Sequence, residues 1–213
     1  MAYFPFFVEL TDKKCLITGG GMVAYRKALV LKDFGPEITV VAKEMIPEME
    51  QLAAQCNGSM TLLKRGFEDT DIQDADFVIA ATSDEELNRH ISVSCRQQKI
   101  PVNVVDVQEE CSFIFPALIK EEEIVVGIST GGSSPTIAQY LKKRFRQAIP
   151  SGFGMLAVQL GSYRELVKEK VSSLPVRTEI FKTMVKEGIR QGGIFTREQA
   201  IELIERKLGE HEQ

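Results

Sequence analysis

The sequence of 213 residues has few histidines and few cysteines. Its two histidines, His90 and His211, are too few for a histidine-rich metal centre, so no metal site is expected. The four cysteines are widely spaced and form no CxxC pair, so a disulfide framework is not expected either. Cys15 and Cys95 fall in apolar patterns, where a free cysteine acts as a small hydrophobic residue.

Long apolar runs and an excess of positive charge are also lacking. No uninterrupted apolar stretch approaches the roughly 20 residues that a membrane-spanning helix needs, so no membrane partner is expected. The first residues show no basic segment followed by an apolar one, which predicts a cytoplasmic protein. The formal net charge of −4 disfavours nucleic acid as a partner, because phosphate contacts require a basic surface.

The sequence does contain short apolar runs that alternate with helical patterns. The runs are continuous rather than alternating, as in parallel strands covered on both faces. Five strands are predicted, at residues 15–18, 37–42, 60–63, 76–82 and 101–105. A helix is expected over 22–34, ended by Gly35, and another over 84–98, opened by a capping box of Ser83 and Glu86. This alternation predicts an α/β fold of the Rossmann type, a doubly wound parallel sheet.

The pattern changes after about residue 112. Two strands, 112–119 and 123–129, are predicted around an acidic turn, and a helix follows with Ser134 as its N-cap and Pro135 at its first position. The last sixty or so residues have helical patterns, with Thr196 and Gln199 capping the final helix. Three parts are predicted: a Rossmann domain over 1–112, a small α/β segment over 113–148 and a helical domain over 149–213.

A glycine-rich motif lies between the first predicted strand and the first predicted helix. Residues 19–24, GGGMVA, match the pattern G-x-G-x-x-G/A. In this pattern Gly19 permits a tight turn, Gly21 lets a diphosphate approach the main chain, and Ala24 allows the helix to pack closely on the strand. The start of the helix then directs its N–H groups at the phosphates. A glycine-rich turn that serves packing alone is the alternative interpretation.

The end of the second predicted strand bears on the choice of dinucleotide. Lys43 and Glu44 stand about twenty residues beyond the glycines. An acidic residue there binds the free 2′-hydroxyl of NAD, whereas a lysine can bind the 2′-phosphate of NADP. We expect NAD as the cofactor, while the alternative that both charges only cap the next helix stays open.

Two further motifs have the residue types of a reactive or binding site. Asp106 follows the fifth predicted strand, at the edge where such sheets bind ligands, so its carboxylate can accept a proton as hydride leaves, or simply cap a turn. Residues 128–135, ISTGGSSP, place hydroxyls and two glycines before a helix, which either binds carboxylates or only caps that helix. The basic residues at 142–146 either form a solvated helix face or attract a polyanionic substrate.

The chain resembles the precorrin-2 dehydrogenase family, which includes the N-terminal module of siroheme synthases. The resemblance covers about residues 5–140, in the family's order and spacing, and rests on the stretches PFFVELTDKKCLITGGGMVAYRKA, TVVAKEMIPEM, FVIAATSDEELN, VNVVDVQEECSFIFPALI and ISTGGSSP. It implies NAD-dependent oxidation of precorrin-2 to sirohydrochlorin, in the biosynthesis of siroheme or cobalamin. It also implies a homodimer that interlocks through residues 113–148.

The resemblance assigns roles to particular residues. Asp106 matches the essential aspartate of the family and is the expected catalytic residue. Cofactor contacts are expected at Gly19, Gly21, Met22, Val23, Ala24, Lys43, Glu44 and Thr82. Contacts with the eight substrate carboxylates are expected at Ser129, Thr130, Gly131, Gly132 and Ser133. Some members carry serine where this chain has Thr130. Some members also insert iron or cobalt, and the sequence does not decide whether this chain does.

A second resemblance gives the alternative function. The stretch ADFVIAATSDEELN is also similar to nucleotide-sensing domains attached to potassium channels. The alternative is therefore a non-catalytic regulatory Rossmann module, since fold alone does not separate a sensor from an enzyme. Asp106 and the segment 112–135 favour the enzyme, because a sensor has no evident need for either.

Overall fold

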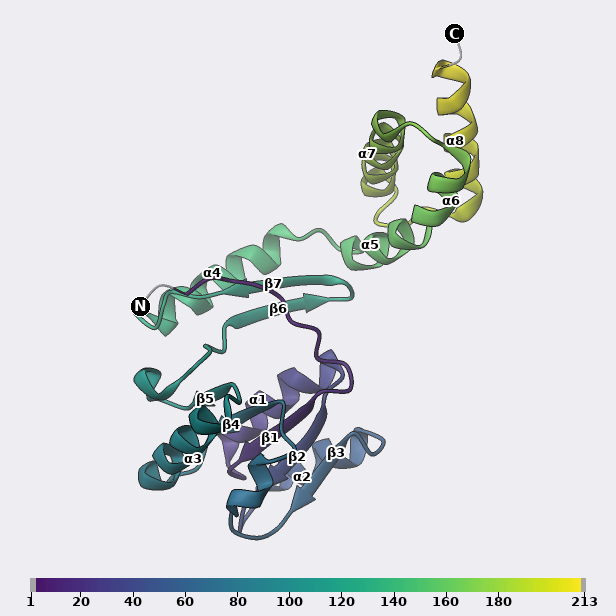
Figure 1. Cartoon of the computed structure of the whole chain (residues 1–213). Helices are drawn as coiled ribbons and strands as arrows, with labels where there is room; N and C mark the ends of the chain where they lie inside the picture. Colours follow the sequence, from purple (N-terminus) through teal and green to yellow (C-terminus); the bar gives the residue numbers. More distant parts are fainter. Residues whose placement is uncertain (1–2, 212–213) are drawn as a thin grey trace. The chain divides into compact units, whose positions relative to one another are not determined.

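The computed structural model describes residues 3–211, which divide into two compact units (Figure 1). One unit runs from Phe4 to Phe115, and the other comprises the chain from Pro116 on, together with Tyr3. The division into three parts, 1–112, 113–148 and 149–213, stays a prediction.

The Phe4–Phe115 unit is built on a five-stranded parallel sheet. Its strands are β1 (Lys14–Thr18), β2 (Glu37–Val41), β3 (Met60–Leu63), β4 (Phe77–Ala80) and β5 (Val102–Val104). They lie in the order β3-β2-β1-β4-β5. From β1, strands β2 and β3 follow on one side and strands β4 and β5 on the other, so the strand order reverses at β1. In such sheets ligands bind beyond the carboxyl ends of the strands, at this point of reversal. The predicted Rossmann fold is confirmed.

Helices cover both faces of this sheet (Figure 1). On one face, α1 (Met22–Leu31) and α2 (Pro47–Gln55) pack Ala28 and Met49 into a core with Ile17 and Val40. On the other, α3 (Glu85–Gln98) contributes Ile91 and Cys95. Burial raises the pKa of the Cys95 thiol to about 11, so this cysteine is neutral at pH 7 and acts as the predicted hydrophobic residue.

Short 3₁₀ helices lie in the connections, at Lys32–Phe34, Asp69–Ile72 and Gln108–Glu110. The first replaces the end of the helix expected over 22–34, because α1 ends at Leu31 and the chain then tightens. Gly35 follows with φ of +79°, a conformation that glycine adopts without strain, as expected for the residue that stops this helix.

The predicted cap of α3 is wrong by one residue. Asp84, not Ser83, is the N-cap, and its carboxylate accepts a hydrogen bond of 3.0 Å from the N–H of Leu87. The aspartate lies in extended backbone immediately before the first helical residue, Glu85. Its negative charge also interacts favourably with the positive end of the helix dipole, which the Ser83 hydroxyl cannot do to the same extent.

The second unit begins with an antiparallel hairpin of β6 (Ala117–Glu121) and β7 (Ile124–Ile128), and α4 (Pro135–Ala148) packs on it through Ala138. The strand expected over 112–119 starts later. Ser112 belongs to the first unit, where its N–H donates to the Val102 carbonyl at 2.8 Å, and Pro116 has no N–H to donate to a ladder.

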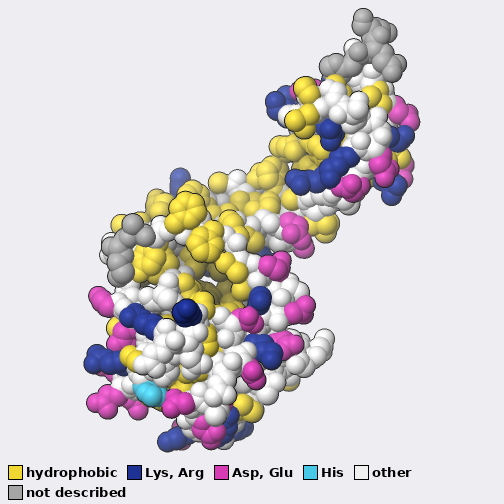
Figure 2. Space-filling view, viewed as in Figure 1, with side chains coloured by type: hydrophobic (Ala, Val, Ile, Leu, Met, Phe, Trp, Pro, Cys, Tyr) yellow, Lys and Arg dark blue, Asp and Glu magenta, His cyan; other side chains and the backbone are white. Residues whose placement is uncertain are grey.

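Four helices complete this unit: α5 (Phe153–Ser162), α6 (Arg164–Lys170), α7 (Leu174–Arg190) and α8 (Arg197–His211). They enclose a core that includes Val167, Ile180 and Phe195. The predicted caps are confirmed here. Ser134 caps α4, and before α8 Thr196 and Gln199 exchange hydrogen bonds. Figure 2 shows acidic and basic side chains interspersed over this helical part and over the sheet unit.

Candidate functional site

The predicted glycine motif forms the turn between β1 and α1. The N–H of Gly19 donates to the Val41 carbonyl at 2.9 Å, and the N–H of Ile46 donates to the Gly20 carbonyl at 3.0 Å. The turn is therefore tied to the segment that follows β2. Gly19 has φ of +114°, a conformation that other residues rarely adopt.

The three glycines have different surroundings. A Cβ atom added at Gly19 would overlap the carbonyl of Ala81, and one added at Gly20 would overlap the carbonyl of Glu44. A Cβ atom at Gly21 would have no neighbour within 4 Å. The first two glycines thus let three segments meet, and the third leaves open space beside the main chain.

The residues around this space fit a bound diphosphate. Gly21 is the N-cap of α1, gives it no side-chain hydrogen bond, and is followed by a first turn without acidic residues. The helix therefore presents main-chain N–H groups and its positive dipole end to an anion. Just before the turn, the buried Thr18 hydroxyl has no hydrogen-bond partner among residues 3–211. Met22 and Val23 are 43% and 42% exposed, which leaves their apolar side chains available to a ligand.

Lys43 and Glu44 lie in the exposed segment between β2 and α2. The main chain of this segment packs directly against Gly20, as the overlap with the Glu44 carbonyl shows. Both predicted residues therefore stand next to the glycine turn. Neither is an N-cap of α2, because Ile46 occupies that position, so the alternative that they cap the helix is wrong.

Thr82 follows β4 and is held by a buried asparagine of α3. The Asn88 carboxamide accepts hydrogen bonds from the Thr82 hydroxyl (2.7 Å) and the Thr82 N–H (3.2 Å), and donates one to the Thr82 carbonyl (3.0 Å). The Asp84 N–H also donates to the Thr82 hydroxyl at 3.2 Å. Because Ala81 contacts Gly19, this network fixes the segment after β4 that packs against the glycine turn.

Asp106 is exposed and lies two residues beyond β5. The N–H of Val105 donates to the Ala80 carbonyl at 3.0 Å, so the chain is still paired with β4 just before it reaches this aspartate. Asp106 itself has φ of +64°, a left-handed conformation that aspartate tolerates better than most residues. The chain thus turns sharply at Asp106, at the same edge of the sheet as the glycine turn.

The segment after Asp106 is attached to β5 by the Cys111 sulfur. Sγ accepts a hydrogen bond from the Val104 N–H at 3.1 Å and another from the Asn103 side chain at 3.4 Å. Asn103 also donates to the Phe113 carbonyl at 3.1 Å, in agreement with the role of a backbone hydrogen-bonding residue. These contacts hold the turn that presents Asp106.

The predicted substrate residues 129–133 form a loop of the second unit, between β7 and α4. Ser129 accepts a hydrogen bond from the Gly131 N–H at 3.0 Å. Thr130 accepts from the Ser134 N–H at 3.2 Å and donates to the Ser134 carbonyl at 3.0 Å. Gly131 and Gly132 have φ of +64° and +86°, so they supply the left-handed turn. The loop's hydroxyls therefore order the loop, while Ser133 and both glycines are exposed.

Two residues that the sequence reasoning missed share one signal. Asn88 and Lys27 are polar residues on otherwise buried helix faces, in α3 and α1 respectively. A polar residue at a core position needs a partner, because burying it alone is costly. The sequence shows the polar residue among apolar ones, but it does not show which residues of other elements bind it.

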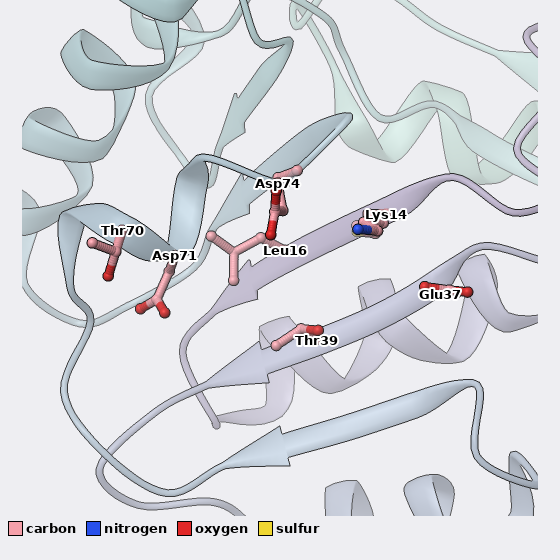
Figure 3. Close-up of a pocket in the computed structure, with 9 residues that line it drawn as sticks. Lys14, Leu16, Glu37, Thr39, Thr70, Asp71 and Asp74 are labelled. Carbon is pink, nitrogen blue, oxygen red and sulfur yellow. The ribbon is translucent and has the colours of Figure 1, made fainter.

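A surface pocket of about 320 Å³ lies elsewhere on the same unit (Figure 3). Lys14, Glu37 and Thr39 from β1 and β2 line one side, and Thr70, Asp71 and Asp74 line the other. The β3–β4 connection contains only a 3₁₀ helix at this point, so no long helix fills the space. Lys14 and Glu37 begin their strands, so the pocket extends to the amino ends of β1 and β2, away from the turn at Gly19–Gly21.

Within residues 3–211, no group of three or more His, Cys, Asp and Glu side chains is placed to hold a metal ion. In the same range, no helix combines the length and the apolar character needed to cross a membrane.

Residues 6–117 match the model of a protein family described as "Putative NAD(P)-binding". The match covers more than half of the chain and includes the glycine turn and Asp106. The chain belongs to this NAD(P)-binding family. Its cofactor is therefore a nicotinamide dinucleotide, in agreement with the space and the helix start at Gly21.

Curated relatives of this NAD(P)-binding chain are named siroheme synthases. That of Thioalkalivibrio sulfidiphilus is 40% identical over 209 residues, or 98% of this chain and 42% of that protein. That of Methylococcus capsulatus is 42% identical over 171 residues, or 80% of this chain and 36% of that protein. The chain thus spans about two fifths of the length of these relatives.

A solved structure named SirC, precorrin-2 dehydrogenase, has the same fold. It matches with a TM-score of 0.75 and covers 97% of this chain and 100% of its own, at 19% sequence identity.

Proposed function

We propose that the chain is an NAD⁺-dependent dehydrogenase that oxidises precorrin-2 to sirohydrochlorin, in siroheme or cobalamin biosynthesis. The observation that carries the proposal is the exposed Asp106 carboxylate of an NAD(P)-binding chain. It lies at the carboxyl edge of the sheet, just after β5, the strand that pairs with β4. The names of the siroheme synthases and of the SirC structure support the choice of substrate.

The chemistry requires little from the protein beyond binding, orientation and one base. Two hydrogens leave the macrocycle, one as hydride and one as a proton. When bound, the oxidised nicotinamide supplies the hydride acceptor. Asp106 accepts the proton on a carboxylate oxygen. Gly21 and the start of α1 hold the diphosphate, and Thr82 borders it from the β4 side.

The proposal includes NAD rather than NADP. Glu44 belongs to the segment that contacts Gly20, and a carboxylate there accepts a hydrogen bond from a free ribose hydroxyl but repels a 2′-phosphate. Lys43 is the residue that opposes this preference. Comparing the affinities of the protein for NAD⁺ and NADP⁺ decides the point.

The substrate part of the proposal rests on residues 129–133. The exposed Ser133 and the two glycines are proposed to meet carboxylates of the macrocycle, at the start of α4 where the helix dipole favours negative charge. The basic residues at 142–146 add long-range attraction for a polyanion.

A homodimer and a cytoplasmic location complete the proposal. The exposed apolar side chains Ile137, Tyr140 and Phe145 of α4 support self-association, because a monomer gains nothing from exposing them. The four cysteines are all unpaired, which fits a reducing compartment.

The test is an anaerobic assay of NADH formation from precorrin-2 and NAD⁺ with the full chain and with Asp106→Asn. The variant should bind NAD⁺ normally and lose most of its turnover, at least a hundredfold in kcat, because general-base catalysis contributes about that much. Glu109→Gln, an exposed acid in the following 3₁₀ helix, is the matched control and should keep its activity.

Equal turnover by Asp106→Asn and the unaltered chain would remove Asp106 from catalysis. Binding of NAD⁺ without any turnover, with NADP⁺ also inactive, would favour a nucleotide sensor instead. Repeating the assay with added Co²⁺ separates oxidation from metal insertion.

A further inference from the structure

β5 is an edge strand of the parallel sheet. It stands last in the strand order, after β4. The Pro101 carbonyl and the Val105 N–H bond to β4, at 2.9 and 3.0 Å, so every second residue of this stretch faces β4. The main-chain groups of Val102 and Val104 therefore face outward. On an edge strand such groups need partners other than a neighbouring strand.

The segment after Asp106 supplies these partners from its side chains. The Ser112 hydroxyl accepts a hydrogen bond from the Val102 N–H at 2.7 Å, and the Ser112 N–H donates to the Val102 carbonyl at 2.8 Å. Two residues further along β5, the Cys111 sulfur accepts from the Val104 N–H at 3.1 Å. Burial raises the pKa of the Cys111 thiol, so at neutral pH the sulfur keeps its proton and also acts as a donor.

The Cys111 sulfur contacts the main chain on both sides of Asp106. Val104 lies two residues before the aspartate and Val107 directly after it, and the carbonyls of both lie within reach of the S–H, at 3.1 and 3.4 Å. The side chain of Asn103, buried in β5, donates to the same sulfur at 3.4 Å. One side chain thus closes the turn on which Asp106 stands.

The backbone of Asp106 depends on this closure. Its φ of +64° is a left-handed conformation, which a residue with a side chain keeps only where the surrounding structure fixes it. After Asp106 the short 3₁₀ helix Gln108–Glu110 returns the chain to β5. The stretch from Val104 to Cys111 is therefore a closed loop, and the sulfur joins its two ends.

We infer that Cys111 is a positioning residue: its sulfur, bonded to the main chain before and after Asp106, fixes the direction in which the Asp106 carboxylate points. The inference rests on the proposed function, because it concerns the residue to which that function assigns the proton transfer. Cys111 acts through Asp106 and takes no part in the chemistry itself. Ser112 is the matched comparison, since it holds the same segment on β5 but bonds to Val102, four residues before Asp106.

The first test measures the turn without substrate. Amide hydrogen exchange of the full chain, resolved by NMR, is compared in Cys111→Ala and Ser112→Ala. Cys111→Ala should speed exchange of the Val105 N–H at least roughly tenfold, because the loosened turn no longer holds its bond to β4. Ser112→Ala should speed exchange at Val102 and leave Val105 unchanged. Identical exchange of the Val105 N–H in Cys111→Ala and the unaltered chain overturns the inference.

The second test measures kcat and KM separately. Cys111→Ala should lower kcat for NADH formation at least roughly tenfold, because a misdirected base accepts the proton less well. The KM for NAD⁺ should not change, because the glycine turn belongs to β1 and α1. Ser112→Ala should lower the unfolding temperature to a similar extent but keep its kcat. Cys111→Ser keeps a donor and an acceptor beside Val104 and should recover most of the lost kcat.

Two results of the second test contradict the inference. Equal losses of kcat in Cys111→Ala and Ser112→Ala would mean that the segment acts through stability alone. A kcat of Cys111→Ser no higher than that of Cys111→Ala would mean that the hydrogen bonds of this side chain do not direct Asp106.

The two tests separate this inference from the proposed function. If the chain does not oxidise precorrin-2 but exchange at Val105 depends on Cys111, the function fails and the closure of the turn by the sulfur stands. If the chain oxidises precorrin-2 and Cys111→Ala keeps its full kcat, the function stands and the positioning role fails.

Discussion

The three consecutive glycines show how much adjacent residues of one type can differ in role. Gly19 and Gly20 are surrounded by main chain, so a side chain at either position would push apart the segments after β4 and β2. Gly21 has open space and an ordinary backbone conformation, with φ of −87°. Packing therefore accounts for two of the glycines but not for the third, and a ligand that approaches the main chain accounts for Gly21.

Asn88 is predicted to control nucleotide affinity from a position behind the site. Asn88→Ala removes three hydrogen bonds to Thr82 and should cost about 1–3 kcal/mol of stability, because it leaves buried groups unpaired. The loosened loop should also weaken NAD⁺ binding by roughly tenfold, which is about 1.4 kcal/mol. Thermal unfolding and calorimetric titration with NAD⁺ measure the two effects.

Ser92→Ala is the matched control for this prediction. Ser92 is buried one turn later in α3 and donates a hydrogen bond of 2.7 Å to the Glu110 carbonyl. Its removal should also lower stability but leave the NAD⁺ affinity unchanged. Equal losses of affinity in both variants would mean that α3 acts through general stability and not through Thr82.

At the scale of elements, the sequence predicted the regular strands better than the connections. The five parallel strands were found because each is a short apolar run covered on both faces. The strand expected from residue 112 was wrong at its start, since Ser112 and Phe113 bond back to β5. Such contacts between segments have no periodic signature in a sequence.

The candidate site was predictable to a similar extent. The glycine turn and Asp106 were found because both follow strands of a recognisable fold. The Thr82–Asn88 network and the Lys27–Phe115 contact were not found, because each joins residues from different elements. Spacing along a helix places Asn88 and Lys27 beside buried positions of α3 and α1, but only the fold supplies the groups that they meet.

At the scale of the whole molecule, the proposed homodimer predicts an effect of one exposed tyrosine. Tyr140 of α4 is 63% exposed. Tyr140→Asp should shift the protein from dimer to monomer, because a charge buried in an apolar interface without a partner is strongly unfavourable. Sedimentation velocity over a range of concentrations measures the change.

Leu174→Asp provides the control for this prediction. Leu174 begins α7, is 68% exposed, and lies outside the hairpin and helix proposed to form the dimer. This variant should sediment as the unaltered chain does. A monomeric unaltered chain, or dissociation caused by Leu174→Asp and not by Tyr140→Asp, would contradict the proposed interface.

A dinucleotide diphosphate is proposed to lie against the bare main chain at Gly21. Calorimetric titration of Gly21→Ala with NAD⁺ tests this most directly. The added methyl group meets no protein atom within 4 Å, and the backbone there suits alanine, so the unfolding temperature should not fall. The affinity for NAD⁺ should fall at least roughly tenfold, because the methyl group occupies the space of the diphosphate. A stable Gly21→Ala variant that binds NAD⁺ as tightly as the unaltered chain would contradict the account.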